Sequence, residues 1–217
     1  MPRTILLSIL AFALAGCSMG GWLHVSEPSV SPPQKPSLSD HGVILLDGIS
    51  ISLRPENTVG GLLTIGPLVF PVIPIGPMAD SNREHLPFWV SVQFEPKDGT
   101  FTFNSKATIL KIGSESYEPI RASQLLTSFS PNREGFRSIP GHDWRCFAQL
   151  VKLLQPVDGS VTTVKQGCIF LEFPIETPSP STEFSVELNG LRRLEQPVSL
   201  PTIMFKAGTK GVFFFLM

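Results

Sequence analysis

The sequence is poor in charge. Asp, Glu, Lys and Arg make up 16% of the 217 residues, against about 25% in an average soluble protein. The two signs nearly balance, with a formal net charge of −1, whereas a nucleic-acid-binding protein shows clustered lysine and arginine. The composition therefore predicts no nucleic-acid partner. Hydrophobic residues make up 42% of the chain, which also excludes a disordered protein.

Recognised catalytic and cofactor motifs are absent as well. The four histidines are scattered along the chain: His24, His41, His85 and His142. None of them pairs at the spacing of metal ligands, and no phosphate-binding glycine loop occurs. The acidic residues of the expected loops include Glu115, Glu118, Asp143 and Asp158. Nothing pairs them as the acid and base of a glycosidase, so we expect no cofactor, no metal and no catalytic residues recognisable from the sequence.

The first residues have the pattern of a secretory signal. Arg3 is followed by a mostly apolar run from Ile5 to Leu14 and then by small residues, which is the composition of a cleaved signal peptide. The run is too short to span a bilayer as a helix, which takes about 20 residues. We therefore predict that residues 1–16 direct export and are removed.

Two motifs overlap at the end of this segment. The residues Gly16-Cys17-Ser18-Met19-Gly20 match the G-x-S-x-G pattern of a hydrolase nucleophile elbow. That elbow needs a strand before it and a helix after it. Here an export signal precedes Ser18 and a Pro- and Ser-rich segment follows it. We therefore do not assign Ser18 as a nucleophile.

The second motif concerns Cys17. The residues Leu14-Ala15-Gly16-Cys17 resemble the lipobox of bacterial lipoproteins, and the resemblance covers only the first 17 residues. It implies cleavage before Cys17, a diacylglycerol on the Cys17 sulfur and acylation of the new amino terminus. Three acyl chains exceed the two signals that stable anchoring needs. Because Ser18 rather than Asp follows the cysteine, the resemblance further implies the outer membrane of a bacterial envelope, on the periplasmic side.

The remaining chain divides into a tether and one domain. Proline and serine are frequent between Cys17 and Asp40, and proline-rich linkers are extended spacers of about 3.1 Å per residue. We expect residues 17–40 to hold the domain away from the membrane. Residues 41–217 are of a size that predicts a single domain.

The domain has the pattern of short β-strands. Apolar and polar residues alternate in seven segments: 49–53, 88–94, 101–103, 108–112, 169–173, 184–188 and 203–205. Such strands with turn residues between them predict an all-β antiparallel β-sandwich, immunoglobulin-like or similar. Two turns are expected to close hairpins, Pro96–Gly99 and Asn189–Gly190. Arg192 and Arg193, after the second turn, are interpreted as a solvated surface.

One segment has helical spacing. Trp144, Phe147, Val151 and Leu154 recur at intervals of three and four residues, which predicts a short amphipathic helix. It is expected from about Asp143 to Leu154, covering one face or end of the sandwich.

Two cysteines remain besides Cys17. Cys146 and Cys168 are an even pair in an oxidising compartment, and a bridge between them is worth about 3 kcal/mol on the chain-entropy model. The alternative is two separately buried thiols. The sequence leaves both open.

The segment from Gly60 to Pro77 is apolar throughout yet contains four prolines. Proline excludes both a membrane helix and a central strand. Two interpretations remain, an extended connection packed against the sandwich or an exposed apolar surface that touches membrane or a partner. The apolar residues near Phe214 are expected to form a strand buried on both faces.

These observations predict a membrane-anchored envelope lipoprotein with a non-enzymatic binding or structural domain. Its partners would be the membrane, through Cys17, and an unidentified envelope protein or glycan. Two alternatives stay open: a subunit of a secretion or envelope-assembly complex, and an envelope hydrolase whose site is assembled only by the fold.

Overall fold

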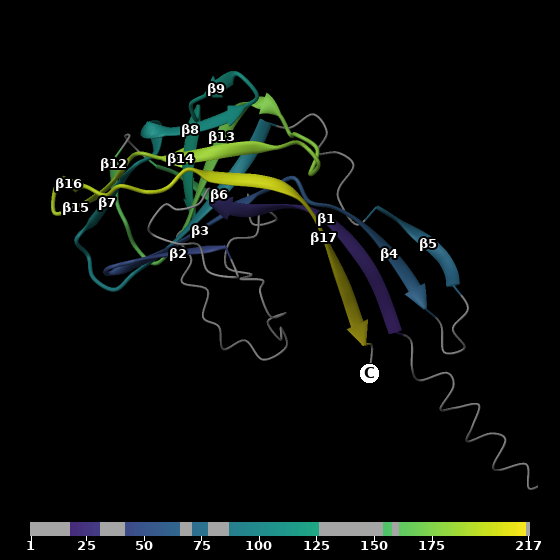
Figure 1. The fold of residues 1–217 in the computed structure, drawn as a ribbon. Helices are drawn as coiled ribbons and strands as arrows, with labels where there is room; N and C mark the ends of the chain where they lie inside the picture. The colour runs from purple at the N-terminus through teal and green to yellow at the C-terminus, as the bar shows by residue number, and fades with distance from the viewer. Residues whose placement is uncertain are drawn as a thin grey trace, which may run out of the picture.

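The computed structural model describes residues 18–30, 42–65, 71–77, 87–125, 154–157 and 161–215. These residues form three antiparallel sheets (Figure 1). The described part of the chain holds no helix long and apolar enough to cross a membrane.

The largest sheet has seven strands in the order β5-β4-β1-β17-β14-β8-β9. Their bounds are β5 Pro71–Pro77, β4 Val59–Ile65, β1 Ser18–Val30, β17 Ile203–Phe215, β14 Phe184–Leu188, β8 Thr108–Ile112 and β9 Glu115–Tyr117.

The second sheet has six strands in the order β11-β10-β13-β6-β3-β2, and the third has four in the order β12-β7-β15-β16. The six are β11 Leu154–Pro156, β10 Arg121–Leu125, β13 Gly167–Glu176, β6 Pro87–Pro96, β3 Ile49–Pro55 and β2 Val43–Leu46. The four are β12 Val161–Thr163, β7 Phe101–Asn104, β15 Leu191–Arg193 and β16 Gln196–Pro197. A single turn of 3-10 helix, Ser105–Ala107, links β7 to β8.

The core lies between the six-stranded sheet and the other two. Phe88 of β6 meets Phe184 of β14 edge to face, with ring centroids 5.6 Å apart. Nearer the other end of β6, Phe94 packs on Phe103 of β7. Buried and partly exposed residues alternate along β3 and β7, as a strand with one buried face requires. The predicted all-β sandwich is therefore confirmed.

Neither predicted hairpin forms. Residues 97–100 connect β6 to β7, but β6 pairs with β3 and β13, while β7 pairs with β12 and β15. The turn passes the chain from one layer of the sandwich to the other. The alternation of apolar and polar residues predicted both strands correctly, because both strands face the same core. It carries no information on which strand is the neighbour.

The Asn189–Gly190 turn makes the same kind of crossing. It joins β14 of the seven-stranded sheet to β15 of the four-stranded sheet. The Asn104 amide donates to the Gly190 carbonyl at 2.9 Å, and a Cβ at Gly190 would collide with the Asn104 carbonyl oxygen. Glycine is needed here for close backbone approach and not for a hairpin turn.

Strand β13 is buried on both faces. Ile169, Leu171 and Phe173 belong to the core cluster. Cys168 and Phe170 alternate with them along the strand and are each 1% exposed, so the side of this sheet opposite the core is also covered. The predicted helix over 143–154 lies outside the described residues, except that Leu154 begins β11 instead of ending a helix.

The expected tether is wrong for Ser18–Val30. These residues form β1, which pairs with β17 along its whole length and with β4 from Ser18 to His24. The proline-rich part begins only after Val30. Pro28, the one proline in the strand, lies where β4 no longer pairs with β1, and a strand with one neighbour tolerates a missing amide donor. The folded domain therefore begins well before residue 41.

The segment from Gly60 to Pro77 contains strands in place of an extended connection, and its contact with a membrane or a partner stays a prediction. Val59–Ile65 and Pro71–Pro77 are paired strands, and β5 is the edge of the seven-stranded sheet. The prolines of β5 thus occupy an edge strand, and the register shifts twice along the pair. Edge strands and bulges are the positions that proline permits within a sheet.

Candidate functional site

The residue on which the sequence prediction rests most lies just outside the described structure. Cys17 immediately precedes Ser18, the first residue of β1. His41, His85, His142, Cys146, Asp143 and Asp158 also lie outside the described residues. Cys168 is described: it is buried on β13 and disulfide-bonded. Its partner is outside the described residues, so the Cys146–Cys168 pairing stays a prediction.

Strand β1 begins in an extension of the seven-stranded sheet. There β5, β4, β1 and the second half of β17 run side by side away from the sandwich (Figure 1). Strand β14 pairs with β17 only from Ile203 to Phe205. Among the described strands, residues 206–215 of β17 therefore pair with β1 alone. Residues 18–24 of β1 pair with β17 on one side and with β4 on the other.

We call the far end of this extension the tip. It consists of Ser18–Trp22, Gly61–Ile65, Pro71–Pro77 and Gly211–Phe215, which are joined by the strand register. These four segments contain no Asp, Glu, Lys, Arg or His. The tip is the end of the molecule next to Cys17.

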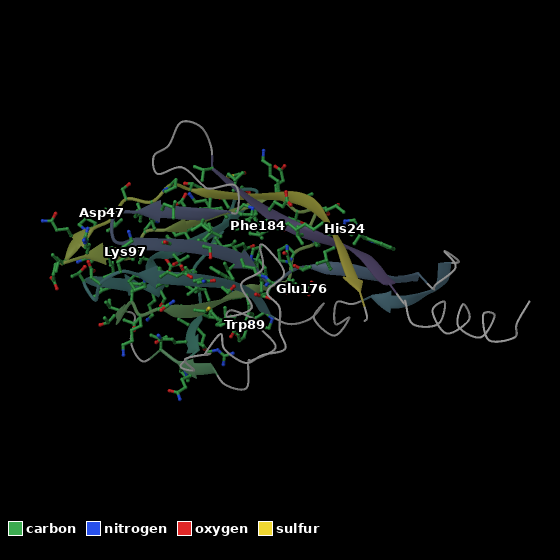
Figure 2. All side chains as sticks on the ribbon, turned by 90° about the horizontal axis from the view of Figure 1, so that it is seen from below. His24, Asp47, Trp89, Lys97, Glu176 and Phe184 are labelled. Carbon is green, nitrogen blue, oxygen red and sulfur yellow. The ribbon has the colours of Figure 1, made fainter. Side chains whose placement is uncertain are left out.

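Exposed aromatic and aliphatic side chains mark the border between the tip and the rest of the extension. Trp22 is 43% exposed, and its register partners, Gly61 and Gly211, are both glycines. Val59, the register partner of His24, is 45% exposed. His24 is itself exposed and lies on the extension (Figure 2). The first charge after the tip on β17 is the exposed Lys210, opposite Leu23.

A buried polar network fixes the base of the extension. The Asn57 side-chain amide donates to Ser26 Oγ at 2.9 Å and to the Pro178 carbonyl at 3.2 Å. Ser26 Oγ in turn donates to the Pro180 carbonyl at 3.4 Å. Both side chains are almost fully buried. The network ties β1 to the loop before β4 and to the loop before β14, so it positions the extension on the sandwich.

A charged cluster lies at the opposite end. The Arg193 guanidinium donates to Asp47 Oδ2 at 2.8 Å and to Asp98 Oδ2 at 3.3 Å, and it lies 5.3 Å from the centre of the Phe101 ring. The prediction of a solvated surface holds for Arg192, which is exposed. It does not hold for Arg193, which these contacts fix in place. Figure 2 shows Asp47 at the end of the molecule remote from His24.

Hydrogen bonds shift the pKa values in this cluster. The Thr100 hydroxyl and amide, and then Arg193, hold the pKa of Asp98 below its ordinary value. The hydrogen bond to Asp47, and then the charge of Asp98, raise the pKa of Arg193. Each shift favours the charged form. Arg193 and Asp98 therefore stay an ion pair at neutral pH.

A second cluster lies on the outer side of the six-stranded sheet. Arg121 donates through Nε to Glu172 Oε2 at 2.7 Å and lies 5.9 Å from the centre of the Trp89 ring. Glu172 is 8% exposed. A buried carboxylate needs such a partner, which makes this pair a structural feature.

The other titratable residues singled out in the sequence are separate from these clusters. Glu115 lies on β9, where it accepts a hydrogen bond from the Tyr117 hydroxyl, and this bond raises the pKa of Tyr117. His24 Nδ1 lies 3.4 Å from the Thr209 hydroxyl. Within the described residues no three His, Cys, Asp or Glu side chains are grouped so that they could hold a metal ion.

Sequence reasoning missed the extension because it judged each segment alone. Each of the paired strands β1, β4 and β17 carries glycine near the border of the tip: Gly20 and Gly21, Gly60 and Gly61, and Gly208 and Gly211. At Gly60 a Cβ would clash with the Leu23 side chain, and it would lie 3.0 Å from the Trp22 carbonyl oxygen. Recurrent glycine beside apolar residues was the available indication that these segments pack together.

Comparison of the chain with protein-family models, with curated proteins and with solved structures finds no match.

Proposed function

We propose that this protein is a lipid-anchored component of a bacterial envelope, and that its β-sandwich binds or positions another envelope component without catalysing a reaction. The observation that carries the proposal is Leu14-Ala15-Gly16-Cys17 behind an export signal. The fold is compatible with it, since Cys17 directly precedes a strand end that projects from the sandwich. An acylated Cys17 would then join membrane and domain without a spacer.

The arrangement of charged residues supports a non-enzymatic role. The clusters of charge described above are ion pairs between opposite signs, Arg193 with Asp47 and Asp98, and Arg121 with Glu172. A catalytic pair of carboxylates instead needs environments that separate their pKa values.

Mass spectrometry of the protein purified from its natural membrane tests the anchor. The amino-terminal peptide should begin at Cys17 and carry the mass of a diacylglycerol and an N-linked acyl chain. An unmodified thiol, or a chain that still begins at Met1, would contradict the proposal.

Fractionation of variants tests what the lipid does. Cys17→Ser should move the protein from the membrane to the soluble fraction, because its acyl chains provide the stable attachment. Ser18→Ala is the matched control at the neighbouring position and should remain on the membrane. Ser18→Asp should shift the protein from the outer to the inner membrane if the outer-membrane assignment is right. Affinity isolation of the lipidated protein then identifies the bound component.

One observation favours the alternative of an assembly subunit. Among the described strands, residues 206–215 of β17 have a neighbour on one side only. An open strand edge is a surface to which another chain can add a strand. Cross-linking from an introduced Thr209→Cys to a different envelope protein would support this alternative, and a β17 edge that forms no such cross-link would argue against it.

A further inference from the structure

We infer that the tip of the four-stranded extension is a membrane-contact surface that lies in the headgroup and upper acyl-chain region of a phospholipid bilayer. This inference deepens the proposed function and rests on its anchor at Cys17. Four observations carry it: the composition of the tip, its position beside Cys17, its dimensions and the position of Trp22.

The composition separates the tip from the rest of the extension. All four tip segments lack charged residues, while Lys206 and Lys210 of β17 follow just beyond them and are exposed. A solvent-facing strand pair ordinarily carries polar or charged side chains on at least one face. The tip thus resembles in composition a surface that is covered by apolar material, and the exposed lysine nearest to it has the charge that anionic headgroups attract.

The position of the tip identifies the covering material as lipid. The acylated residue would be Cys17, and the next residue, Ser18, pairs with Ile65 of β4 and Phe215 of β17. Acyl chains on Cys17 therefore enter the bilayer beside the ends of β4 and β17. The pairing of Ser18–Val30 within the sheet leaves no linker between them that could hold the tip away from the membrane.

The dimensions of the tip exclude a full crossing of the bilayer. Ser18–Trp22 spans about 17 Å at ~3.4 Å per residue, which is close to half of a hydrocarbon core of about 30 Å. Backbone groups at an open strand edge are costly in hydrocarbon, where no water can bind them. Strand β5 and the second half of β17 are the outer strands of the extension. We therefore place these edges at the headgroup boundary, where water is still present.

Trp22 marks the boundary. It is partly exposed, lies between Gly61 and Gly211, and is the last residue of the tip on β1. Tryptophan is enriched at the membrane–water interface, because its ring is apolar and its indole N–H binds water. His24 and Lys210 follow on the solvent side.

Depth-dependent fluorescence quenching tests this inference on the purified lipidated protein. The protein is reconstituted into phospholipid vesicles that contain lipids brominated either near the carbonyl end or near the methyl end of the acyl chain. The difference between the wild type and Trp22→Phe isolates the emission of Trp22. We expect this component to be blue-shifted and quenched, more strongly by the shallow bromines. The Trp89→Phe variant should retain the effect, because Trp89 packs on Phe170 in the sandwich.

A charge substitution gives a second readout with a matched control. On vesicles that contain anionic lipid, Val59→Asp, next to the tip, should lower the quenching of Trp22, because anionic headgroups repel a carboxylate at the membrane surface. Leu45→Asp is the equivalent change at an exposed aliphatic residue of β2, and it should leave the quenching unchanged. Equal effects of the two variants, or none from Val59→Asp, would contradict the membrane contact.

The failures of the two proposals are distinguishable. An unmodified Cys17 ends the lipid anchor whatever the vesicles show. If the acyl chains hold the protein on the vesicles but the emission of Trp22 is not quenched, only the tip contact is overturned. If that protein also forms cross-links between tips of two copies, through an introduced Val59→Cys, the covering surface is a second copy of the chain and the inference is wrong.

Discussion

Phe94 and Phe103 face each other across the sandwich with ring centroids 5.1 Å apart and planes inclined by 53°. Both rings are almost completely buried. The pair joins β6 of the six-stranded sheet to β7 of the four-stranded sheet, so it contributes both apolar burial and a specific ring contact between the layers.

Removing one of these rings should cost much of the stability of the domain. We expect Phe103→Ala to lower the free energy of unfolding by about 3–5 kcal/mol, from lost burial and the cavity left behind. Denaturant titration followed by circular dichroism measures the change. Leu45→Ala, at a residue that is 60% exposed, is the control and should stay within about 0.5 kcal/mol. A comparable loss from both variants would show that the contact is not specific.

Removing Arg121 should be harmful because it leaves Glu172 buried without its partner. We expect Arg121→Met to lower the free energy of unfolding by about 1–3 kcal/mol, the cost typical of an orphaned charged group. Lys111→Met is the matched control. Its carboxylate partner, Glu187, is more exposed than Glu172, so its loss should cost at most about 1 kcal/mol. The reverse order would refute the role given to Glu172 burial.

The turn between β15 and β16 holds two non-glycine residues in the left-handed region, Leu194 at φ 47° and Glu195 at φ 71°. Such a conformation costs about 1–2 kcal/mol for a residue with a Cβ. A two-residue hairpin turn of this type favours Asn followed by Gly. Glu195→Gly should therefore raise the thermal midpoint, and adding Leu194→Asn should raise it further. Glu195→Ala keeps the Cβ, so it should bring no such gain.

Asp98 should contribute to stability only when it is ionised. Its folded-state pKa is lowered, chiefly by the Thr100 hydroxyl, so its contribution is complete above the ordinary Asp pKa near 3.8 and is lost as the pH falls through the folded value. The effect is modest because the group is at the surface. Asp98→Asn should flatten the pH dependence of the unfolding midpoint below about pH 4. A variant with the wild-type acid profile would exclude this contribution.

The disulfide of Cys168 is expected to join Cys146. Peptide mapping without reductant should recover the two cysteines in one linked peptide, and Cys146→Ser should lower stability by about 3 kcal/mol on the chain-entropy model. Cys168 linked to Cys17 instead would contradict both this pairing and the lipid anchor.

The sequence predicted the strands of the sandwich well because each carries its burial pattern locally. The alternation in Phe88–Phe94 and in Phe184–Leu188 reports a strand with one face toward a core. The neighbours of these strands were wrong or unassigned, since the partner of a strand is fixed by packing between distant segments. The turn at Pro96–Gly99 has the chemistry of a hairpin and yet leads into another sheet.

The candidate site was less predictable than the fold. Proline in Pro71–Pro77 and the serine and proline near Pro28 argued against strands when each segment was considered alone. They are compatible with strands once the segment is an edge or has one neighbour. For Pro28 that condition depends on β17, whose residues lie far away in the sequence.

The pairing of β1 with β17 has a consequence for folding after the proposed export. Ser29 and Met204 are 175 positions apart in the chain and lie opposite each other. An exported chain that emerges with its amino end first must keep the β17 side of β1, a central strand of the largest sheet, unpaired until almost two hundred further residues have been delivered. Contacts so distant in sequence form slowly, and unpaired apolar strands aggregate while they wait. If the protein is exported as proposed, its biogenesis should therefore depend on a holding chaperone more than its modest size would indicate.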